Sequence, residues 1–284
     1  MSKTIKIAGV PEHFNLPWHM CIEDGEFEEV GINLEWTDVP EGTGKMCQML
    51  RDGETDMAVI LTEGIVKDIN AGNDCKIVQV YVQSPLIWGI HVDAKSNYKE
   101  LADLKDKKPA ISRLGSGSHL MSIVNAKNQN WDSSTLQFEI VNTIDGAVES
   151  LSSGKADYFM WERFMTKPLV DNGTFRRIAD CPTPWPCFVI AVRNEVLKKH
   201  PNTIAQILEI INITTEEFKI IPSIDRTLAS KYNQKLEDIQ EWLSLTHWSQ
   251  KNLDEKVLNK IQNQLFDLNI IDKKGTFAEM VKAL

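Results

Sequence analysis

The sequence predicts an α/β protein built from two similar lobes and completed by a helical C-terminal segment. Three observations support this fold class. Short apolar, β-branched runs alternate with helical patterns over roughly the first two-thirds of the chain, which is typical of α/β folds with largely parallel sheets. One helix-to-strand motif occurs twice, and the pattern after Val192 becomes almost entirely helical.

Strands are expected where β-branched and apolar residues gather between turn-forming residues. Ten such runs are predicted, at Lys6–Val10, Ile32–Val39, Asp56–Ile60, Ile77–Val82, Leu86–Val92, Pro109–Arg113, Leu136–Asn142, Asp157–Trp161, Phe175–Ile178 and Cys187–Val192. Helices are expected between most of them, for example at Trp18–Glu28, Lys45–Asp52, Gly64–Ala71, His119–Asn128 and Asp145–Ser152. The helical segment is divided into Asn194–Ile220, Asp225–Ala229, Leu236–Leu245, Asp254–Leu268 and Thr276–Leu284.

The repeated motif has the form Leu-x-x-Gly-x-x-Asp. It occurs as Leu50, Gly53 and Asp56, and again as Leu151, Gly154 and Asp157. In each copy the leucine belongs to the last turn of a helix, and the glycine takes the left-handed position that ends it. The aspartate then leads into a buried strand. The matching context indicates two lobes that are built alike.

Two strands are predicted as the crossings between the lobes. Leu86–Val92 precedes the stretch DLKDKKPAISR, which opens the second lobe, and Cys187–Val192 closes that lobe. A pair of crossing strands would form a hinge. Lobe 1 is therefore expected to comprise residues 1–90 and 188–284, and lobe 2 residues 93–186. The alternative is that both segments are simply core strands.

Composition and charge exclude several classes of protein. Apolar residues make up 42% and charged residues 25% of the 284 residues, as in ordinary globular proteins. The net charge of -9 arises in the first third: residues 1–90 hold 6 basic and 15 acidic groups, and the remaining 25 of each sign cancel. An acidic first third repels phosphate backbones, so no nucleic-acid partner is expected.

No targeting or membrane segment is expected. The sequence holds no run near the roughly 18 apolar residues of a transmembrane helix. Its first residues lack the apolar core of a signal peptide, which predicts a cytoplasmic location. Five cysteines without a CxxC pair favour free thiols, the alternative being a Cys181–Cys187 bridge.

Motifs for metal binding and hydrolysis are missing. The six histidines show no metal-ligand spacing, so neither a metal nor another cofactor is expected. The absence of a G-x-S-x-G elbow disfavours α/β-hydrolase chemistry. A cysteine nucleophile stays open, and no catalytic residue is assigned.

Two loops between a predicted strand and a predicted helix are candidate ligand sites. The first contains Ser116, Gly117, Ser118 and His119. Free N–H groups at a helix start, together with serine hydroxyls, favour an anionic oxygen. The alternative is an ordinary serine N-cap. The second loop contains Gly42 and Thr43, with a plain turn as its alternative.

Aromatic and acidic residues gather after the predicted strands, where ligands of α/β sheets bind. These candidates are His13, Phe14, Trp18, Thr62, Glu63, Trp161, Glu162 and Trp185. Aromatic faces would contact a flat or apolar ligand, although core packing explains part of the set equally well. The two glutamates occupy similar places in the two lobes and would suit an amine, an amidine or an aminopyrimidine. The alternative for each is a solvated loop acid.

Several short motifs occur in an order that resembles a known family. They are Glu26-Phe27 before Gly31-Ile32-Asn33-Leu34, Gly53-Glu54-Thr55-Asp56, Asp103-Leu104-Lys105-Asp106-Lys107-Lys108 before a strand, Gly115-Ser116-Gly117-Ser118-His119, and Gly154-Lys155-Ala156-Asp157. Over roughly residues 3–220 this order resembles the type II periplasmic substrate-binding proteins of ABC importers, in the branch that binds sulfonates, nitrate, taurine and thiamine-type pyrimidines. The resemblance implies a two-lobed fold with two hinge crossover strands.

The resemblance implies that the lobes close on a small organic ligand that is anionic or amphoteric. His13, Phe14, Trp18, Gly42, Thr43, Thr62 and Glu63 would form one wall, and Ser116, Gly117, Ser118, His119, Trp161, Glu162 and Trp185 the other. An ABC permease is a further partner, and a periplasmic location would follow if that role holds. The alternative is a cytosolic enzyme on the same fold, of the thiamine-pyrimidine or menaquinone biosynthesis type. A third alternative is a cytosolic sensory or partner-binding module.

Overall fold

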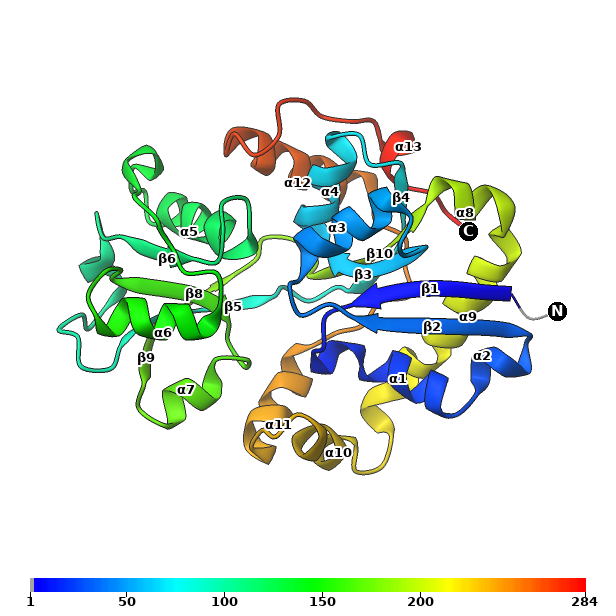
Figure 1. Cartoon of the computed structure of the whole chain (residues 1–284), viewed down its shortest axis with the longest axis horizontal. Helices are drawn as coiled ribbons and strands as arrows, with labels where there is room; N and C mark the ends of the chain where they lie inside the picture. Colours follow the sequence, from blue (N-terminus) through cyan, green and yellow to red (C-terminus); the bar gives the residue numbers. More distant parts are fainter. Residues whose placement is uncertain (1–2) are drawn as a thin grey trace. The chain divides into compact units, whose positions relative to one another are not determined.

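The computed structural model describes residues 3–284, which form two compact units. Unit 1 comprises residues 3–84 and 185–284, and unit 2 comprises Pro85–Pro184. Each unit contains a five-stranded sheet with helices packed against it (Figure 1). The α/β fold class predicted from the sequence is therefore confirmed.

The sheet of unit 1 has the strand order β2-β1-β3-β10-β4. Its strands are β1 (Lys3–Gly9), β2 (Ile32–Asp38), β3 (Met57–Leu61), β4 (Cys75–Val82) and β10 (Phe188–Arg193). The first three are parallel, whereas β10 runs antiparallel to both β3 and β4. Its N-terminal helices are η1 (His13–Asn15), α1 (Leu16–Glu23), α2 (Glu26–Glu29), α3 (Thr43–Asp52) and α4 (Thr62–Asn70).

The sheet of unit 2 repeats this arrangement in the order β7-β6-β8-β5-β9. Its strands are β5 (Ile87–Asp93), β6 (Pro109–Ile111), β7 (Glu139–Ile140), β8 (Tyr158–Glu162) and β9 (Phe175–Pro182). The helices are η2 (Leu101–Leu104), α5 (Gly117–Asn128), η3 (Ser133–Thr135), α6 (Ile144–Ser152) and α7 (Lys167–Asp171). Again one strand, β5, runs antiparallel to both of its neighbours.

The repeated Leu-x-x-Gly-x-x-Asp motif has the same structure in both units. Gly53 and Gly154 follow α3 and α6 with left-handed φ values of 73° and 72°, which end the helices. The Asp56 carboxylate accepts a hydrogen bond from the Lys6 backbone N–H at 2.9 Å, and the Asp157 carboxylate accepts one from Lys108 at 2.8 Å. Each aspartate therefore joins its strand to the neighbouring parallel strand.

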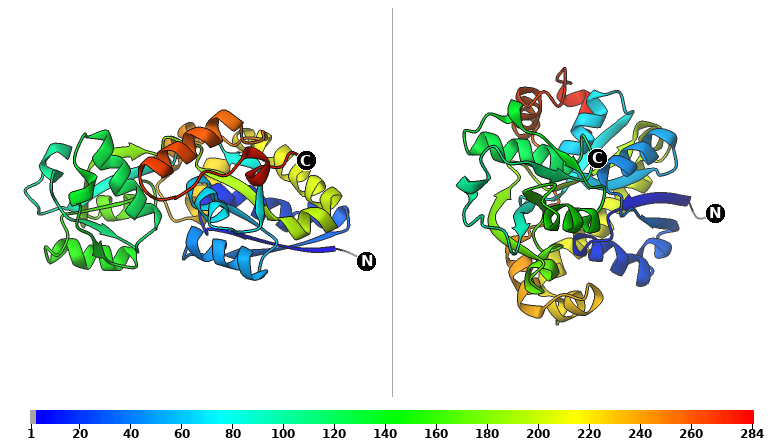
Figure 2. Two further views of the ribbon diagram at one scale, coloured as in Figure 1. Left: turned by 90° about the horizontal axis from the view of Figure 1, so that it is seen from above. Right: turned by 60° about the vertical axis from the view of Figure 1, so that its left-hand side comes forward.

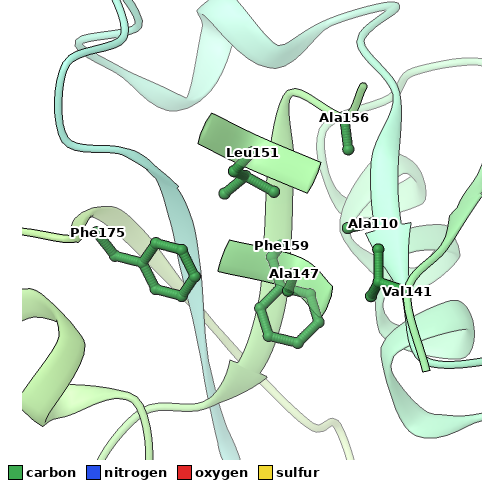
Figure 3. Packing of buried hydrophobic residues seen from close by; sticks show 7 residues of the cluster. All are labelled: Ala110, Val141, Ala147, Leu151, Ala156, Phe159 and Phe175. Carbon is green, nitrogen blue, oxygen red and sulfur yellow. The ribbon is translucent and has the colours of Figure 1, made fainter. Parts of the chain in front are cut away.

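One core cluster of unit 2 lies between its sheet and α6. Seven buried residues form this cluster: Ala110, Val141, Ala147, Leu151, Ala156, Phe159 and Phe175. Figure 3 shows the Phe159 ring of β8 beside Ala147 of α6, with Ala110 and Val141 next to each other. Ala147 on the helix and Ala110 on β6 are small, so helix and sheet approach closely while the aromatic rings fill the space beside them.

The C-terminal segment of unit 1 is helical, as expected, but it is more divided. It contains α8 (Asn194–Lys199), α9 (Pro201–Glu217), η4 (Phe218–Ile220), α10 (Ile224–Lys231), α11 (Leu236–Leu245), α12 (Glu255–Asp267) and α13 (Phe277–Met280). The single helix expected from Asn194 breaks before Pro201, because proline lacks the N–H that a continuous helix needs. Gly25 likewise divides the helix expected over Trp18–Glu28.

The same segment also covers the outer edge of β4. Val80 N–H donates to the Lys251 carbonyl at 2.9 Å, and Lys282 N–H donates to the Ile77 carbonyl at 3.0 Å. The chain after α13 is thus extended instead of helical, because it pairs with this strand. Figure 2 shows α12 and α13 beside the sheet of unit 1.

The chain passes between the units at Ser84–Pro85 and Pro184–Trp185, ahead of β5 and β10. The expected boundaries lie a few residues further along the chain. The reason for the difference is that β5 pairs only within the sheet of unit 2, and β10 only within that of unit 1. Each strand therefore belongs to the unit that it enters.

Candidate functional site

In each unit most of the candidate residues lie at one end of the sheet, where the parallel strands finish. In unit 1, β1, β2 and β3 all end there. The antiparallel β10 begins there, because Phe188 pairs with Leu61 and Val82. Ligands of α/β sheets bind beyond the carboxyl ends of the strands.

The segment after β1 buries a histidine without hydrogen-bond partners. His13 is fully buried in η1, and its ring stacks on Trp242 of α11 with centroids 4.2 Å apart. Within residues 3–284, neither its Nδ1 nor its Nε2 has a partner. Burial lowers the pKa of His13 to about 3, so the ring is neutral at physiological pH. A neutral ring offers one donor and one acceptor.

Aromatic residues hold this segment in place. The Phe14 carbonyl accepts hydrogen bonds from the Tyr81 hydroxyl at 2.8 Å and from Trp248 Nε1 at 3.3 Å. The Phe14 ring lies 5.3 Å from that of Phe188, at the start of β10. Trp18 instead packs in the core against Phe27 and other rings, as the packing alternative describes.

The segment that enters unit 1 packs against the start of α4. The Thr62 hydroxyl donates to the Pro186 carbonyl at 2.6 Å. Trp185 Nε1 donates to Glu63 Oε2 at 2.7 Å, and both side chains are buried. Trp185 was expected on the wall of the second lobe, but it belongs to unit 1. The hydrogen bonds from Trp185 to Glu63 and from Thr62 to the Pro186 carbonyl hold this segment there.

Glu63 is a buried carboxyl group without a counterion. Only 4% of its surface is exposed, and within residues 3–284 it forms no ion pair. Burial raises the pKa of Glu63 to about 7, and hydrogen bonds from its own backbone N–H and from Trp185 offset only part of this rise. The carboxyl group is therefore poised between its neutral and ionised forms near neutral pH.

The loop with Gly42 and Thr43 lies next to the start of α4. Gly42 precedes α3 with a φ of 76°, a left-handed value that favours glycine. Thr43 packs against Gly64 so closely that a Cβ on Gly64 would lie 2.2 Å from the Thr43 Cγ2 atom. The starts of α3 and α4 are therefore in contact, which places Thr43 beside the residue that follows Glu63.

In unit 2 the serine hydroxyls serve the loop itself. Ser116 is the N-cap of α5 and accepts from the His119 N–H at 3.4 Å. Ser118 Oγ accepts from the Ser112 N–H at 2.9 Å and lies 3.1 Å from Ser116 Oγ. His119 Nδ1 accepts from the Gly115 N–H at 3.1 Å. The capping alternative therefore describes what the serine side chains do in this structure.

Glu162 and Trp161 end β8 in different environments. Glu162 is buried, and its Oε2 accepts from the Met165 N–H at 2.7 Å within the turn that leads to α7. Trp161 is half-buried and stacks on Phe159, with ring centroids 5.4 Å apart. Glu162 pairs with Trp88 in the sheet, whereas Glu63 lies beyond the strand end. The two glutamates therefore occupy similar but not equivalent places.

Three aromatic residues at these sheet edges escaped the sequence analysis. They are Trp88, Phe188 and Trp242. Trp88 lies over Gly117, where an added Cβ would come within 2.7 Å of its ring. The ring centroids of Trp88 and Trp161 are 6.3 Å apart. Trp88 and Phe188 stand near the starts of antiparallel strands, so a search after strand ends passes them by. An aromatic residue at the start of a predicted strand, such as Trp88 in β5 or Phe188 in β10, is the signal that could have indicated these two.

Other reactive groups are buried or scattered. Among the residues that the structure describes, no three His, Cys, Asp or Glu side chains are arranged to hold a metal ion. All five cysteines are buried, and none of them forms a disulfide within residues 3–284. Burial raises the pKa of Cys21, Cys47, Cys75 and Cys181. These four are poor nucleophiles at neutral pH. Over residues 3–284, no helix is both long and apolar enough to cross a membrane.

Comparison with known proteins identifies the fold. The Candida albicans CA3427 gene product, which has the generic periplasmic binding protein fold, is 25% identical, with a TM-score of 0.89 over 98% of this chain and 96% of its own. The alkanesulfonate-binding protein SsuA from Xanthomonas axonopodis pv. citri, bound to MOPS, is 15% identical, with a TM-score of 0.83 over the whole of both chains. SsuA from Escherichia coli is 17% identical, with a TM-score of 0.77 over 99% of this chain and 92% of its own.

The chain has the type II periplasmic-binding-protein fold, and the solved structures that it resembles include sulfonate-binding proteins. This confirms the resemblance inferred from the order of the motifs. More particularly, residues 88–181, nearly all of unit 2, match the family model described as Ca3427-like PBP. No curated protein sequence matches the chain.

Proposed function

We propose that the chain is a binding protein for a small organic ligand that is anionic or amphoteric. The observation that carries this proposal is His13, whose two ring nitrogens are buried without partners at the sheet edge where ligands of α/β folds bind. Buried polar atoms are normally satisfied, so such a group calls for a donor and an acceptor from elsewhere. The fold supports the proposal, since solved structures of this fold include binding proteins for alkanesulfonates.

The proposal is tested by thermal unfolding and calorimetry with a panel of small compounds. The panel contains MOPS, ethanesulfonate, taurine, nitrate, propionate and 4-amino-2-methylpyrimidine. A compound that binds only the native state stabilises it by RT ln(1 + [L]/Kd), which is about 2.7 kcal/mol at a hundredfold excess over Kd. The proposal expects at least one member to raise the unfolding temperature and to give a saturable heat of binding.

The variant His13→Phe tests the role of the ring nitrogens. Phenylalanine keeps the stacking on Trp242 and removes both polar atoms. We expect the variant to fold and to bind the compound at least tenfold more weakly. Binding by none of the panel contradicts the proposed function, whereas equal binding by variant and wild type removes His13 from the site.

Two features of an import role remain proposals. An ABC permease would be the partner, and the two units would close on the ligand. Closure predicts a smaller radius of gyration in X-ray scattering when the ligand is added. Co-purification of a permease with the tagged chain in the presence of the ligand would support the partner.

A further inference from the structure

We propose that Glu63 is the recognition group for an N–H donor of the ligand, such as a protonated amine, an amidine or the amino group of a heteroaromatic ring. The inference rests on the ligand binding proposed above and adds the chemistry of one ligand group. It is argued from the burial, the charge environment and the hydrogen bonds of Glu63.

The first step is the missing counterion. Glu63 is 4% exposed, and within residues 3–284 no Lys, Arg or His forms an ion pair with it. An ionised carboxylate in such a place is costly unless it is paired and hydrogen-bonded. Asp68, by contrast, is paired with Arg51 at 2.6 Å, and Asp157 accepts from the backbone N–H of Lys108 in the neighbouring strand. Glu63 has only its own backbone N–H and the Trp185 indole as hydrogen-bond donors, and neither carries a charge.

The second step is the fixed orientation of the carboxyl group. Its hydrogen bond to another residue is the one from Trp185 Nε1 to Oε2, at 2.7 Å. A carboxylate can accept about four hydrogen bonds, and Glu63 uses one for its own backbone N–H and one for Trp185, so about half of its capacity is unused. Trp185 is itself 3% exposed and lies between two prolines, which restrict its backbone. The indole therefore holds the carboxyl group in place, with acceptor capacity to spare for a ligand.

The third step is the contrast with Glu162. That residue is as deeply buried, at 5% exposed, but its carboxylate accepts from the Met165 N–H and so supports the turn before α7. Glu63 carries no comparable backbone contact to another residue. Of the two glutamates that the sequence singles out, Glu63 is the one available to a ligand.

The experiment uses compounds that differ by a single amino group. The pairs are taurine with ethanesulfonate, and 4-amino-2-methylpyrimidine with 2,4-dimethylpyrimidine. Calorimetric titrations compare the wild-type chain, Glu63→Gln, and Glu255→Gln as an exposed control on α12. Because a hydrogen bond to a charged group changes affinity by about tenfold to a hundredfold, the amine should bind the wild type at least tenfold more tightly than its partner. Glu63→Gln should lose this preference, and Glu255→Gln should keep it.

A second readout is proton release on binding. The pKa of Glu63 is raised to about 7, so the carboxyl group is partly protonated at pH 7 and a cationic ligand should release part of a proton. Titrations in two buffers of different ionisation enthalpy measure this release, and Glu63→Gln should abolish it. Trp185→Phe, which removes only the indole N–H, should weaken binding of the amine less than Glu63→Gln does.

The outcomes separate this inference from the proposed function. If an amine binds the wild type and Glu63→Gln equally, or no more tightly than its amine-free partner, the role of Glu63 is overturned while ligand binding stands. If none of the four compounds and none of the wider panel binds, the proposed function fails and this inference fails with it.

Discussion

Replacing Glu63 by glutamine should change how the stability of the chain depends on pH. The carboxyl group is 4% exposed, and its pKa is raised to about 7, whereas in the unfolded chain it titrates near 4.5. Between these values the folded state binds more protons than the unfolded state. Stability from this group is therefore present at low pH and is lost as the pH rises towards 7.

The magnitude follows from the difference of about 2.5 pKa units, at 1.36 kcal/mol per unit. Full ionisation of Glu63 costs about 3 kcal/mol, and most of this cost falls between pH 5 and pH 8.5. Glu63→Gln does not titrate and keeps an acceptor for the Trp185 indole. Relative to wild type, the variant should therefore gain about 2–3 kcal/mol of unfolding free energy over this pH range.

Urea titrations at pH 5, 6, 7 and 8.5 measure this change, with Glu255→Gln as the exposed control. The control should differ from wild type by a constant amount at every pH. A difference between Glu63→Gln and wild type that stays constant from pH 5 to pH 8.5 would refute the reasoning. It would mean either that Glu63 titrates like an exposed glutamate or that another group that ionises with it compensates its charge.

Three further predictions concern other parts of the fold. The rings of His13 and His91 should stay neutral down to about pH 5 in NMR titrations, because burial lowers their pKa values to about 3 and about 4; protonation near pH 6.5 would contradict their burial. Gly64→Ala should destabilise the wild type by about 1–3 kcal/mol through its clash with Thr43. In the Thr43→Ser background, which lacks the clashing methyl group, the same change should be neutral or stabilising by up to about 1 kcal/mol, because alanine favours helices; equal effects in both backgrounds would exclude the clash. Deleting residues 276–284 should uncover the edge of β4 near Ile77 and increase aggregation in light scattering; an unchanged monomer would show that this cover is dispensable.

The order of strands and helices was largely predictable from the sequence. All ten predicted strands overlap strands of the structure, because β-branched runs bounded by turn residues strongly favour the extended conformation. The repeated motif was informative because its glycine and aspartate act locally, through a left-handed φ and a backbone hydrogen bond. The helix predicted over Asn194–Ile220 is divided at Pro201, because proline lacks the N–H that a continuous helix needs.

The candidate site was less predictable, because its contacts depend on tertiary structure. Sequence position alone made Glu63 and Glu162 look alike, yet one receives an indole N–H and the other a backbone N–H. Ser118 resembled a ligand group, and its hydroxyl is used by Ser112. Trp88 was not predicted, because the antiparallel β5 places its first residues, and not its last, at the end of the sheet where β8 finishes.

The insertion of β10 between β3 and β4 has a consequence for the way the chain folds during synthesis. Unit 2 is one uninterrupted segment, so it can fold as soon as Pro184 has left the ribosome. The first 84 residues cannot complete their own sheet at that stage, because β3 and β4 are joined only through a strand made more than a hundred residues after β3. Such distant pairing is slow to form. A nascent chain halted when Pro184 has just left the ribosome should therefore hold a protease-resistant unit 2 beside an N-terminal segment that proteases still cleave.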